Sequence, residues 1–130
     1  MDKKLIASLT EKYRKADHSL FLLDYDGTLV DYTPIPGTDR LPERIFDILK
    51  KIIDSQRSEV FIITGRSYND IEIIFDNLPV NIIAEHGAMI RENGIWKNQI
   101  NDDCLWKENI IPLLNQITLS CPESFIEEKP

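Results

Sequence analysis

Short apolar runs alternate with amphipathic segments along the first 84 residues of the chain. Three of the runs have the length of strands buried on both faces rather than of helices. They lie at residues 20–23, 60–63 and 80–84. Apolar side chains recur at helical spacing in residues 3–16, 42–56 and 67–78. Strands that alternate with helices of this length predict right-handed βαβ crossovers, and therefore an α/β fold with a parallel sheet and helices on both sides.

Local signals mark two further boundaries. Ser67, followed by Asp70 three residues later, is typical of a helix N-cap. Residues 88–96 predict an antiparallel hairpin, because two apolar segments flank Asn93 and Gly94, a pair that favours a type I′ turn. An antiparallel piece is therefore expected after the parallel strands.

The last third of the chain is expected to be mainly helical. Residues 102–117 keep helical spacing, although Pro112 should kink or restart that helix because it lacks an amide donor. Residues 124–129 predict the beginning of a strand. The chain therefore ends in a segment of α+β character.

The composition of the chain limits the classes of binding partner and the location to be expected. The 15 Lys and Arg against 22 Asp and Glu give a formal net charge of −7, which disfavours nucleic acid and anionic membranes. No apolar run reaches the roughly 20 residues of a membrane span and no apolar signal core begins the chain, so we expect a cytoplasmic protein. Cys104 and Cys121 form no metal-ligand cluster and are expected to be buried thiols without a chemical role.

Candidate chemistry begins where the first apolar run ends, at Asp24 and Asp26. In open parallel sheets, ligands bind at the carboxyl ends of the strands. Two aspartates two residues apart project from one face of an extended chain, so their negative charges repel unless a divalent cation or a shared proton compensates them. Because the chain offers hard oxygen ligands, we expect Mg²⁺ rather than zinc or copper.

Residues 24–28, with the strand before them, resemble the Asp-x-Asp-x-Thr nucleophile motif of the haloacid dehalogenase (HAD) superfamily of phosphotransferases. The resemblance implies a HAD-like Rossmannoid core in which Asp24 attacks phosphorus and forms an aspartyl-phosphate. Asp26 would protonate the leaving oxygen and then deprotonate the hydrolytic water, while its backbone carbonyl joins Asp24 in binding Mg²⁺. Thr28 would hold the turn that Gly27 permits.

Thr64 and Gly65 follow the second strand and fill the place of the superfamily's second motif. A hydroxyl and backbone amides at this place would hold phosphoryl oxygens near a helix N-terminus. Taken alone, Thr-Gly at a strand end favours an ordinary turn. Together with the two aspartates upstream, it indicates a phosphate-binding loop.

More particular strings resemble the trehalose-6-phosphate phosphatase family over about residues 18–130. They lie at residues 23–30, 63–67, 84–88 and 125–129. The resemblance implies hydrolysis of trehalose 6-phosphate to trehalose and phosphate, with Arg66, His86 and Gly87 near the substrate. Two readings stay open for two of these residues: Arg66 also fits a structural salt bridge, and His86 also fits a loop histidine that orients the backbone.

In that family, a cap domain is inserted after the third strand, and a Glu-x-Lys pair on its first strand contacts sugar hydroxyls. Glu127 and Lys129 match this pair, although the same residues also fit a solvated strand edge. The resemblance therefore implies that residues 1–97 are the N-terminal part of the catalytic core and that residues 98–130 begin an α+β cap.

The superfamily also requires a later lysine and further acidic metal ligands. For the acidic ligands, the chain offers no candidate pair after residue 103 except the dipeptide Glu127-Glu128. We therefore expect a chain truncated within the cap, which binds Mg²⁺ weakly and is inactive by itself. We also expect poorly covered apolar surface. The side chains concerned are Trp96, Trp106, Leu113 and Phe125.

Three alternatives remain at this point. In the first, the protein acts as another HAD sugar phosphatase, of the sucrose-phosphate or glycerate-phosphate type. In the second, it is a non-catalytic sugar-phosphate-binding domain fused to a trehalose-phosphate synthase, an alternative that the intact pair of Asp24 and Asp26 argues against. In the third alternative, a partner chain supplies the residues that this chain lacks.

Overall fold

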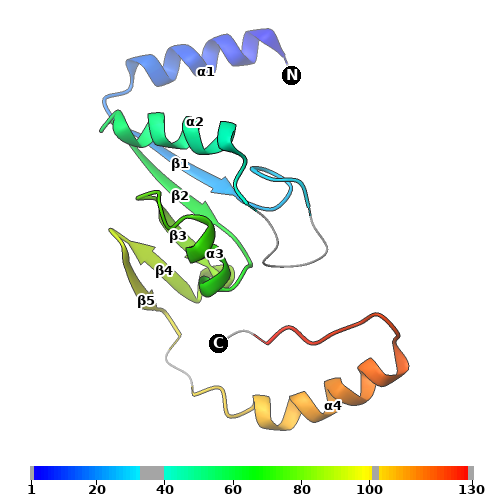
Figure 1. Cartoon of the computed structure of the whole chain (residues 1–130). Helices are drawn as coiled ribbons and strands as arrows, with labels where there is room; N and C mark the ends of the chain where they lie inside the picture. The colour runs from blue at the N-terminus through cyan, green and yellow to red at the C-terminus, as the bar shows by residue number, and fades with distance from the viewer. Residues whose placement is uncertain (1, 33–39, 101–102, 129–130) are drawn as a thin grey trace. The chain divides into compact units, whose positions relative to one another are not determined.

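The computed structural model describes residues 2–32, 40–100 and 103–128. The chain divides into two compact units, Met1–Gln99 and Ile100–Pro130, each of which is described by itself (Figure 1). The expected boundary between a core and a cap lay at residues 97 and 98. Whether the two units correspond to a catalytic core and a cap stays a prediction.

One five-stranded sheet organises the first unit, with the strand order β1-β2-β3-β4-β5. The strands β1, β2 and β3 are parallel, as the alternating pattern predicts, and β4 and β5 form the expected antiparallel hairpin. Their bounds are β1 Ser19–Asp24, β2 Ser58–Ile63, β3 Asn81–Ala84, β4 Met89–Glu92 and β5 Ile95–Asn98. Because β1 and β2 are parallel, their carboxyl ends lie at the same edge of the sheet.

Helices connect and precede the parallel strands. Their bounds are α1 Lys3–Lys15, α2 Glu43–Asp54 and α3 Tyr68–Ile74, and the short 3₁₀ helix η1 Glu85–Gly87 follows β3. The predicted cap of α3 is confirmed, because the amide of Asp70 donates to the Ser67 hydroxyl at 3.2 Å. The tight turn Asn93-Gly94 also agrees with type I′, since both residues have positive φ, 51° and 78°.

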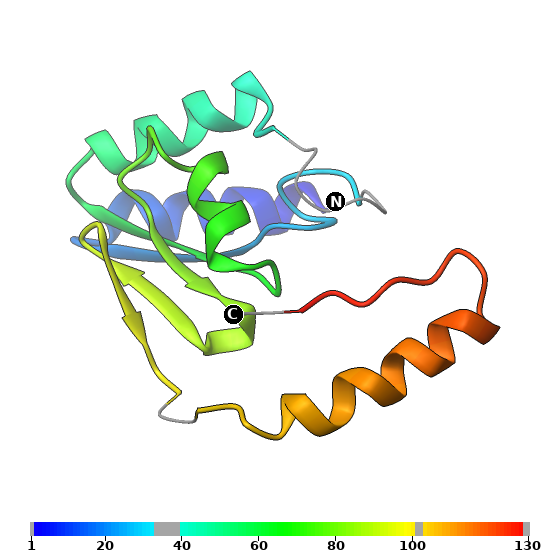
Figure 2. The same cartoon turned by 60° about the horizontal axis from the view of Figure 1, so that its bottom comes forward.

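The hydrophobic core lies on one face of the sheet. Side chains from alternate positions of β2 and β3, among them Ile62 and Ile82, form one cluster with Leu49 of α2, with Ile71 of α3 and with Phe75, which directly follows α3. Both crossover helices therefore cover the same face (Figure 2), and the prediction of helices on both sides is wrong. The reason is geometric, because two right-handed crossovers that step in the same direction across a sheet place their helices on one face.

The prediction that β1 is buried on both faces is also wrong. Phe21 and Leu23 pack against the core, whereas Leu20 and Leu22 on the opposite face are 56% and 58% exposed. In the described part of the chain, β1 pairs with β2 alone and ends the strand order. Leu20 and Leu22 lie on the face of β1 that α2 and α3 do not cover.

Helix α1 has the expected bounds but buries no residue. Leu5, Leu9 and Tyr13 on its apolar side are 51%, 55% and 40% exposed. The ring of Tyr13 still meets the ring of Phe21 edge to face, with 5.8 Å between the centroids. The apolar side of α1 therefore contacts the sheet mainly at its C-terminal end.

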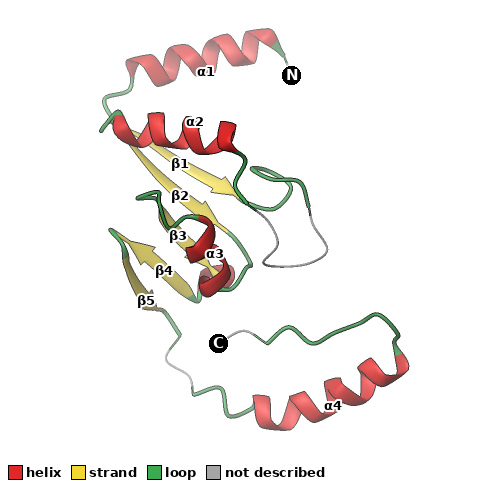
Figure 3. Ribbon diagram, viewed as in Figure 1, coloured by secondary structure: helices red, strands yellow, loops and turns green. Residues whose placement is uncertain are grey.

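The second unit contains helix α4, Lys107–Ser120. Pro112 lies inside this helix, so of the two expected effects, a kink or a restart, the restart does not occur. Residues 124–128 form no strand (Figure 3), which also corrects the prediction, because a strand needs a neighbour that pairs with its backbone groups. Trp106, Leu113 and Phe125 are 55%, 55% and 66% exposed, as expected.

Two smaller expectations fail. Trp96 is half-buried rather than poorly covered, because its ring meets the ring of Tyr68 at 5.6 Å and its indole N–H donates to Glu72. Cys104 is half-buried and Cys121 is exposed, so neither is a buried thiol. Over the described residues, no helix is long and apolar enough to cross a membrane.

We expect Phe75→Ala to lower the free energy of unfolding by about 3–5 kcal/mol, because it removes a fully buried ring that packs against Tyr25. The matched control is Ile73→Ala, two residues earlier in α3, whose side chain is 79% exposed and whose loss should change stability by about 0.5 kcal/mol or less. Denaturant unfolding measures both changes. Equal losses of unfolding free energy for the two variants would contradict the placement of Phe75 in the hydrophobic core.

Candidate active site

The turn after β1 presents two carboxylates with a buried ring between them. Asp24 ends β1 and is exposed, Tyr25 is completely buried, and Asp26 is half-buried. The Tyr25 ring packs edge to face against Phe75, with 5.7 Å between the centroids. Tyr25 therefore anchors the turn in the core, while the carboxylates on either side of it remain accessible.

Backbone hydrogen bonds close this turn tightly. The amides of Leu29 and Val30 both donate to the carbonyl of Tyr25, and the amide of Gly27 donates to the carbonyl of Val30 at 2.8 Å. Gly27 has a φ of +76°, in the left-handed region that glycine adopts without strain. The Thr28 hydroxyl donates to Asp24 Oδ2 at 3.0 Å, so this oxygen of the carboxylate is held by the turn.

Asp26 forms an ion pair with Arg66, which follows β2. The Arg66 guanidinium donates through Nε to Oδ1 and Oδ2 at 3.2 and 3.0 Å and through Nη2 to Oδ1 at 2.6 Å. The side chain of Arg66 is 8% exposed and that of Asp26 is 27% exposed. Of the two roles that the sequence leaves open for Arg66, the structure shows the salt bridge.

Thr64 and Gly65 lie directly after β2, beside the end of β1. Asp24 is paired in register with Ile63, the residue before Thr64, so the parallel register brings the two motifs together. The amide of Thr64 donates to the carbonyl of Ile83 at 2.9 Å, and its buried hydroxyl oxygen accepts from the amide of Arg66 at 3.1 Å. The hydroxyl hydrogen of Thr64 and the amide of Gly65 are left as donors in this loop.

The 3₁₀ helix η1 holds the Thr64–Arg66 loop from its other side. The amide of Glu85 donates to the carbonyl of Arg66 at 3.1 Å, and the amide of His86 donates to the carbonyl of Thr64 at 3.3 Å. Glu85 and His86 both have positive φ, 52° and 56°, a conformation that non-glycine residues seldom adopt. The contacts of η1 with the loop therefore hold a strained backbone in place.

Glu85 is a residue of this site to which sequence reasoning gives no role. Its carboxylate accepts from the amide of Tyr68, the first residue of α3, at 3.0 Å. Glu85 thereby links η1 to the N-terminal end of the helix that follows Arg66. A glutamate beside a histidine and a glycine carries no local signal for this contact, because its partner lies 17 residues earlier in the chain.

His86 is exposed, and its imidazole lies against Gly65. A β-carbon at position 65 would lie 2.5 Å from His86 Cε1 and 2.6 Å from Nε2, which is closer than atoms can approach. This contact agrees with the reading of His86 as a residue that shapes the loop. Gly87 follows with a φ of +102° and an open space around it, so it is required for the turn.

The other candidate residues belong to the second unit. Glu127 is exposed and belongs to no strand, and Lys129 lies outside the described residues. The neighbouring Glu128 approaches Lys107 of α4 at 3.7 Å. The predicted contact of Glu127 and Lys129 with a sugar therefore remains a prediction.

The donors fit a divalent metal only in part. Within residues 2–32, 40–100 and 103–128, no cluster of three or more His, Cys, Asp or Glu side chains is placed to hold a metal ion. Asp24 offers an accessible carboxylate, whereas the carboxylate of Asp26 already faces the cationic Arg66. Mg²⁺ commonly keeps several waters and uses one or two protein oxygens plus a substrate phosphate, so Asp24 with the backbone of Asp26 suits it.

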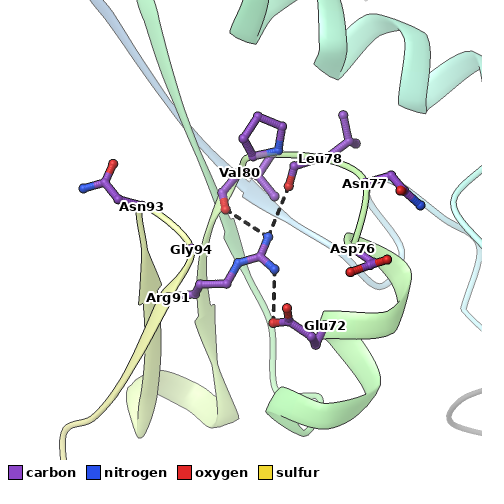
Figure 4. A pocket seen from close by; sticks show the side chains of 9 residues that line it. Glu72, Asp76, Asn77, Leu78, Val80, Arg91, Asn93 and Gly94 are labelled. Atoms are coloured by element: carbon purple, nitrogen blue, oxygen red, sulfur yellow. Dashed lines mark hydrogen bonds and ion pairs between the residues drawn. The ribbon is translucent and has the colours of Figure 1, made fainter.

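A pocket of about 630 Å³ lies away from this site, at the amino end of β3 (Figure 4). Arg91 reaches across it from β4 and donates to the carbonyls of Leu78 and Val80 at 3.2 Å each. Arg91 Nη1 also lies 3.1 Å from a carboxylate oxygen of Glu72 in α3. These contacts join α3 and the loop after it to the hairpin, so the pocket has a structural arginine at its centre.

Comparison with known proteins agrees with the geometry. The family model described as trehalose-phosphatase matches residues 22–130. The chain is 34% identical over 126 residues to a trehalose-phosphatase of Schizosaccharomyces pombe, covering 93% of this chain and 15% of the relative. It is 31% identical over 124 residues to the UDP-forming alpha,alpha-trehalose-phosphate synthase B of Dictyostelium discoideum, covering 93% of this chain and 16% of that protein.

Solved structures lead to the same family. The C-terminal domain of Candida albicans trehalose-6-phosphate phosphatase matches with a TM-score of 0.88 and 29% identity, over 95% of this chain and 43% of that one. The Aspergillus fumigatus trehalose-6-phosphate phosphatase matches with a TM-score of 0.69 and 32% identity, over 95% and 47%. A haloacid dehalogenase-like hydrolase of Bacillus subtilis, at 22% identity and a TM-score of 0.59, shares the fold. The chain thus spans less than half of these structures and less than a fifth of the curated relatives.

We expect Gly65→Ala to lower the free energy of unfolding by about 1–3 kcal/mol, because the added methyl group collides with the His86 imidazole. Adding His86→Ala should recover most of this loss. The matched control is Gly94→Ala, whose φ of +78° costs about 1–2 kcal/mol but whose β-carbon meets no atom within 4 Å, so His86→Ala should not relieve it. Thermal unfolding of the four variants measures the coupling, and its absence between positions 65 and 86 would contradict the contact.

Proposed function

The chain belongs to the trehalose-phosphatase family of the HAD superfamily, and we propose that the protein containing it hydrolyses trehalose 6-phosphate to trehalose and phosphate. The observation that carries the proposal is the placement of Asp24. Asp24 is the last residue of β1, and its accessible carboxylate is oriented by the Thr28 hydroxyl. It lies beside the end of β2, which Thr64 follows directly. This is the arrangement that a carboxylate nucleophile and a phosphoryl cradle require.

In the first step of the proposed reaction, an Asp24 oxygen attacks phosphorus and the bond from phosphorus to the sugar oxygen breaks. Asp26, which must enter this step protonated, gives its proton to the departing oxygen, which leaves as a hydroxyl of trehalose. The Thr64 hydroxyl and the Gly65 amide donate to the phosphoryl oxygens. They are suited to this task because the amides of Thr64 and Arg66, on either side of Gly65, already donate within the fold.

In the second step, Asp26 takes a proton from water as the water oxygen attacks the phosphorus of the aspartyl-phosphate. The bond between phosphorus and Asp24 breaks, phosphate leaves, and both aspartates return to their starting states. A Mg²⁺ ion held by Asp24 and the backbone carbonyl of Asp26 would neutralise negative charge on the phosphoryl group. Tyr25 and Arg66 keep the turn in place throughout.

The sugar specificity and setting of the reaction extend the proposal. We infer that Glu127 and Lys129 contact the sugar hydroxyls from a cap and that His86 and Gly87 line the side of the phosphate loop. Several relatives are named as trehalose-phosphate synthases, and the chain spans 14–18% of the first four curated relatives. A fusion to a synthase in a cytoplasmic protein is therefore part of the proposal.

We expect Asp24→Asn to lower phosphate release from trehalose 6-phosphate by at least about 10³-fold in the full-length protein, because an amide cannot serve as the nucleophile. The matched control is Asp54→Asn, since Asp54 lies at the end of α2, is 63% exposed and forms an ion pair with Lys50 one turn earlier in the helix. The control should keep full activity. Activity that survives Asp24→Asn would refute the nucleophile, and equal cleavage of glucose 6-phosphate would refute the disaccharide.

Removal of divalent metal should abolish phosphate release, and excess Mg²⁺ should restore it, because the donors around Asp24 are hard oxygens. The measurement is phosphate release after treatment with EDTA, followed by titration with Mg²⁺ or Zn²⁺. The expected order is recovery with Mg²⁺ and little recovery with Zn²⁺. Undiminished turnover at full chelation would contradict the metal part of the proposal.

A further inference from the structure

The guanidinium of Arg66 hydrogen-bonds to Asp26 and is largely shielded from solvent. Three hydrogen bonds at 2.6–3.2 Å join the two side chains, and they involve both oxygens of the carboxylate. Because the planar guanidinium contacts both carboxylate oxygens, it fixes the rotation of the Asp26 carboxylate as well as the distance between the two side chains. Since the Arg66 side chain is 8% exposed, little of it is left to meet a substrate.

The rest of Arg66 is held just as firmly. Its guanidinium carbon lies 4.9 Å from the centroid of the Tyr25 ring, which is completely buried. Its amide donates to the Thr64 hydroxyl and its carbonyl accepts from the amide of Glu85. Arg66 is thus fixed at the side chain, at the backbone nitrogen and at the backbone oxygen.

Asp26 remains able to reach a substrate in this arrangement. Its side chain is 27% exposed, and Oδ2 accepts one of the three hydrogen bonds from Arg66. A carboxylate oxygen has two lone pairs, so Oδ2 keeps acceptor capacity beyond this bond. A group that transfers a proton must lie about 2.6–3.2 Å from its target, which makes the orientation of the carboxylate decisive.

We propose that Arg66 is a positioning residue that holds the Asp26 carboxylate where it can pass a proton to the leaving sugar oxygen. The inference rests on the proposed function and adds a specific role for this ion pair. Its consequence for the first step is selective: loss of Arg66 should slow formation of the aspartyl-phosphate from substrates whose leaving oxygen needs a proton. The same step should be little changed for substrates whose leaving group departs readily as an anion.

The test compares two substrates of the full-length protein, trehalose 6-phosphate and 4-nitrophenyl phosphate, whose nitrophenolate leaves without a proton. We expect Arg66→Gln and Asp26→Asn each to lower kcat/KM for trehalose 6-phosphate by about 10²-fold or more, and kcat/KM for 4-nitrophenyl phosphate by less than about tenfold. The ratio kcat/KM is compared because it reports the formation of the aspartyl-phosphate, whereas kcat also contains its hydrolysis, in which Asp26 acts on both substrates. The double variant should lose no more than Asp26→Asn alone, because the two residues act as one unit. This non-additivity is a second readout, which is measured with trehalose 6-phosphate as the only substrate.

The matched control is Arg91→Gln, which removes another buried arginine from an ion pair, at the opposite end of β3 (Figure 4). It should change the rates of both substrates by the same factor. If Arg66→Gln does not fold, as judged by thermal unfolding, Arg66→Lys replaces it. Lysine keeps the positive charge but lacks the planar group that binds both carboxylate oxygens, so we expect the same selective loss of rate with a smaller magnitude.

Two results would overturn the inference. An equal loss on both substrates would make Arg66 a structural residue, and a raised KM for trehalose 6-phosphate with unchanged kcat would make it a substrate ligand. Failure of the proposed function has a different signature. In that case Asp24→Asn would keep its activity on both substrates, whereas failure of the inference alone would leave Asp24→Asn inactive.

Discussion

The parallel register of β1 and β2 is the constraint on which the site depends. Pairing of Asp24 with Ile63 sets the turn after β1 beside the loop after β2, although the two segments lie 40 residues apart in the chain. The Asp26–Arg66 ion pair then joins the two loops directly. A slip by one residue would move every side chain of a strand to its other face, so the same register that fills the core also places the carboxylates.

Two buried arginines show how similar contacts serve different ends. Arg91 ties α3 and the loop before β3 to the hairpin, and its partners are two backbone carbonyls and Glu72. Arg66 holds an aspartate that remains partly exposed at the carboxyl edge of the sheet. A buried ion pair contributes little net stability in general, although removal of one partner is costly. The location of Asp26, rather than the strength of its bond to Arg66, indicates a role in chemistry.

The order of the elements in the first unit followed from local patterns. Strand and helix periodicity, the Ser67 cap and the Asn93-Gly94 turn are short-range properties, so the sequence predicted them and the structure confirms them. The positions of Asp24 and Thr64 at strand ends were predictable for the same reason. Patterns failed at residues 124–128, where an extended apolar segment needs a partner strand that no local signal supplies.

Contacts between residues distant in the chain decided the features that the pattern of apolar and polar residues could not predict. The pattern could not tell which face of the sheet the helices cover, because an apolar run such as 20–23 looks the same whether one face or both are buried. It left Arg66 with two roles and Glu85 with none, since their partners are 40 and 17 residues away. Local residue types thus determined which elements form and which side chains could react. The register and the loop contacts, which depend on residues distant in the chain, decided how those side chains are held.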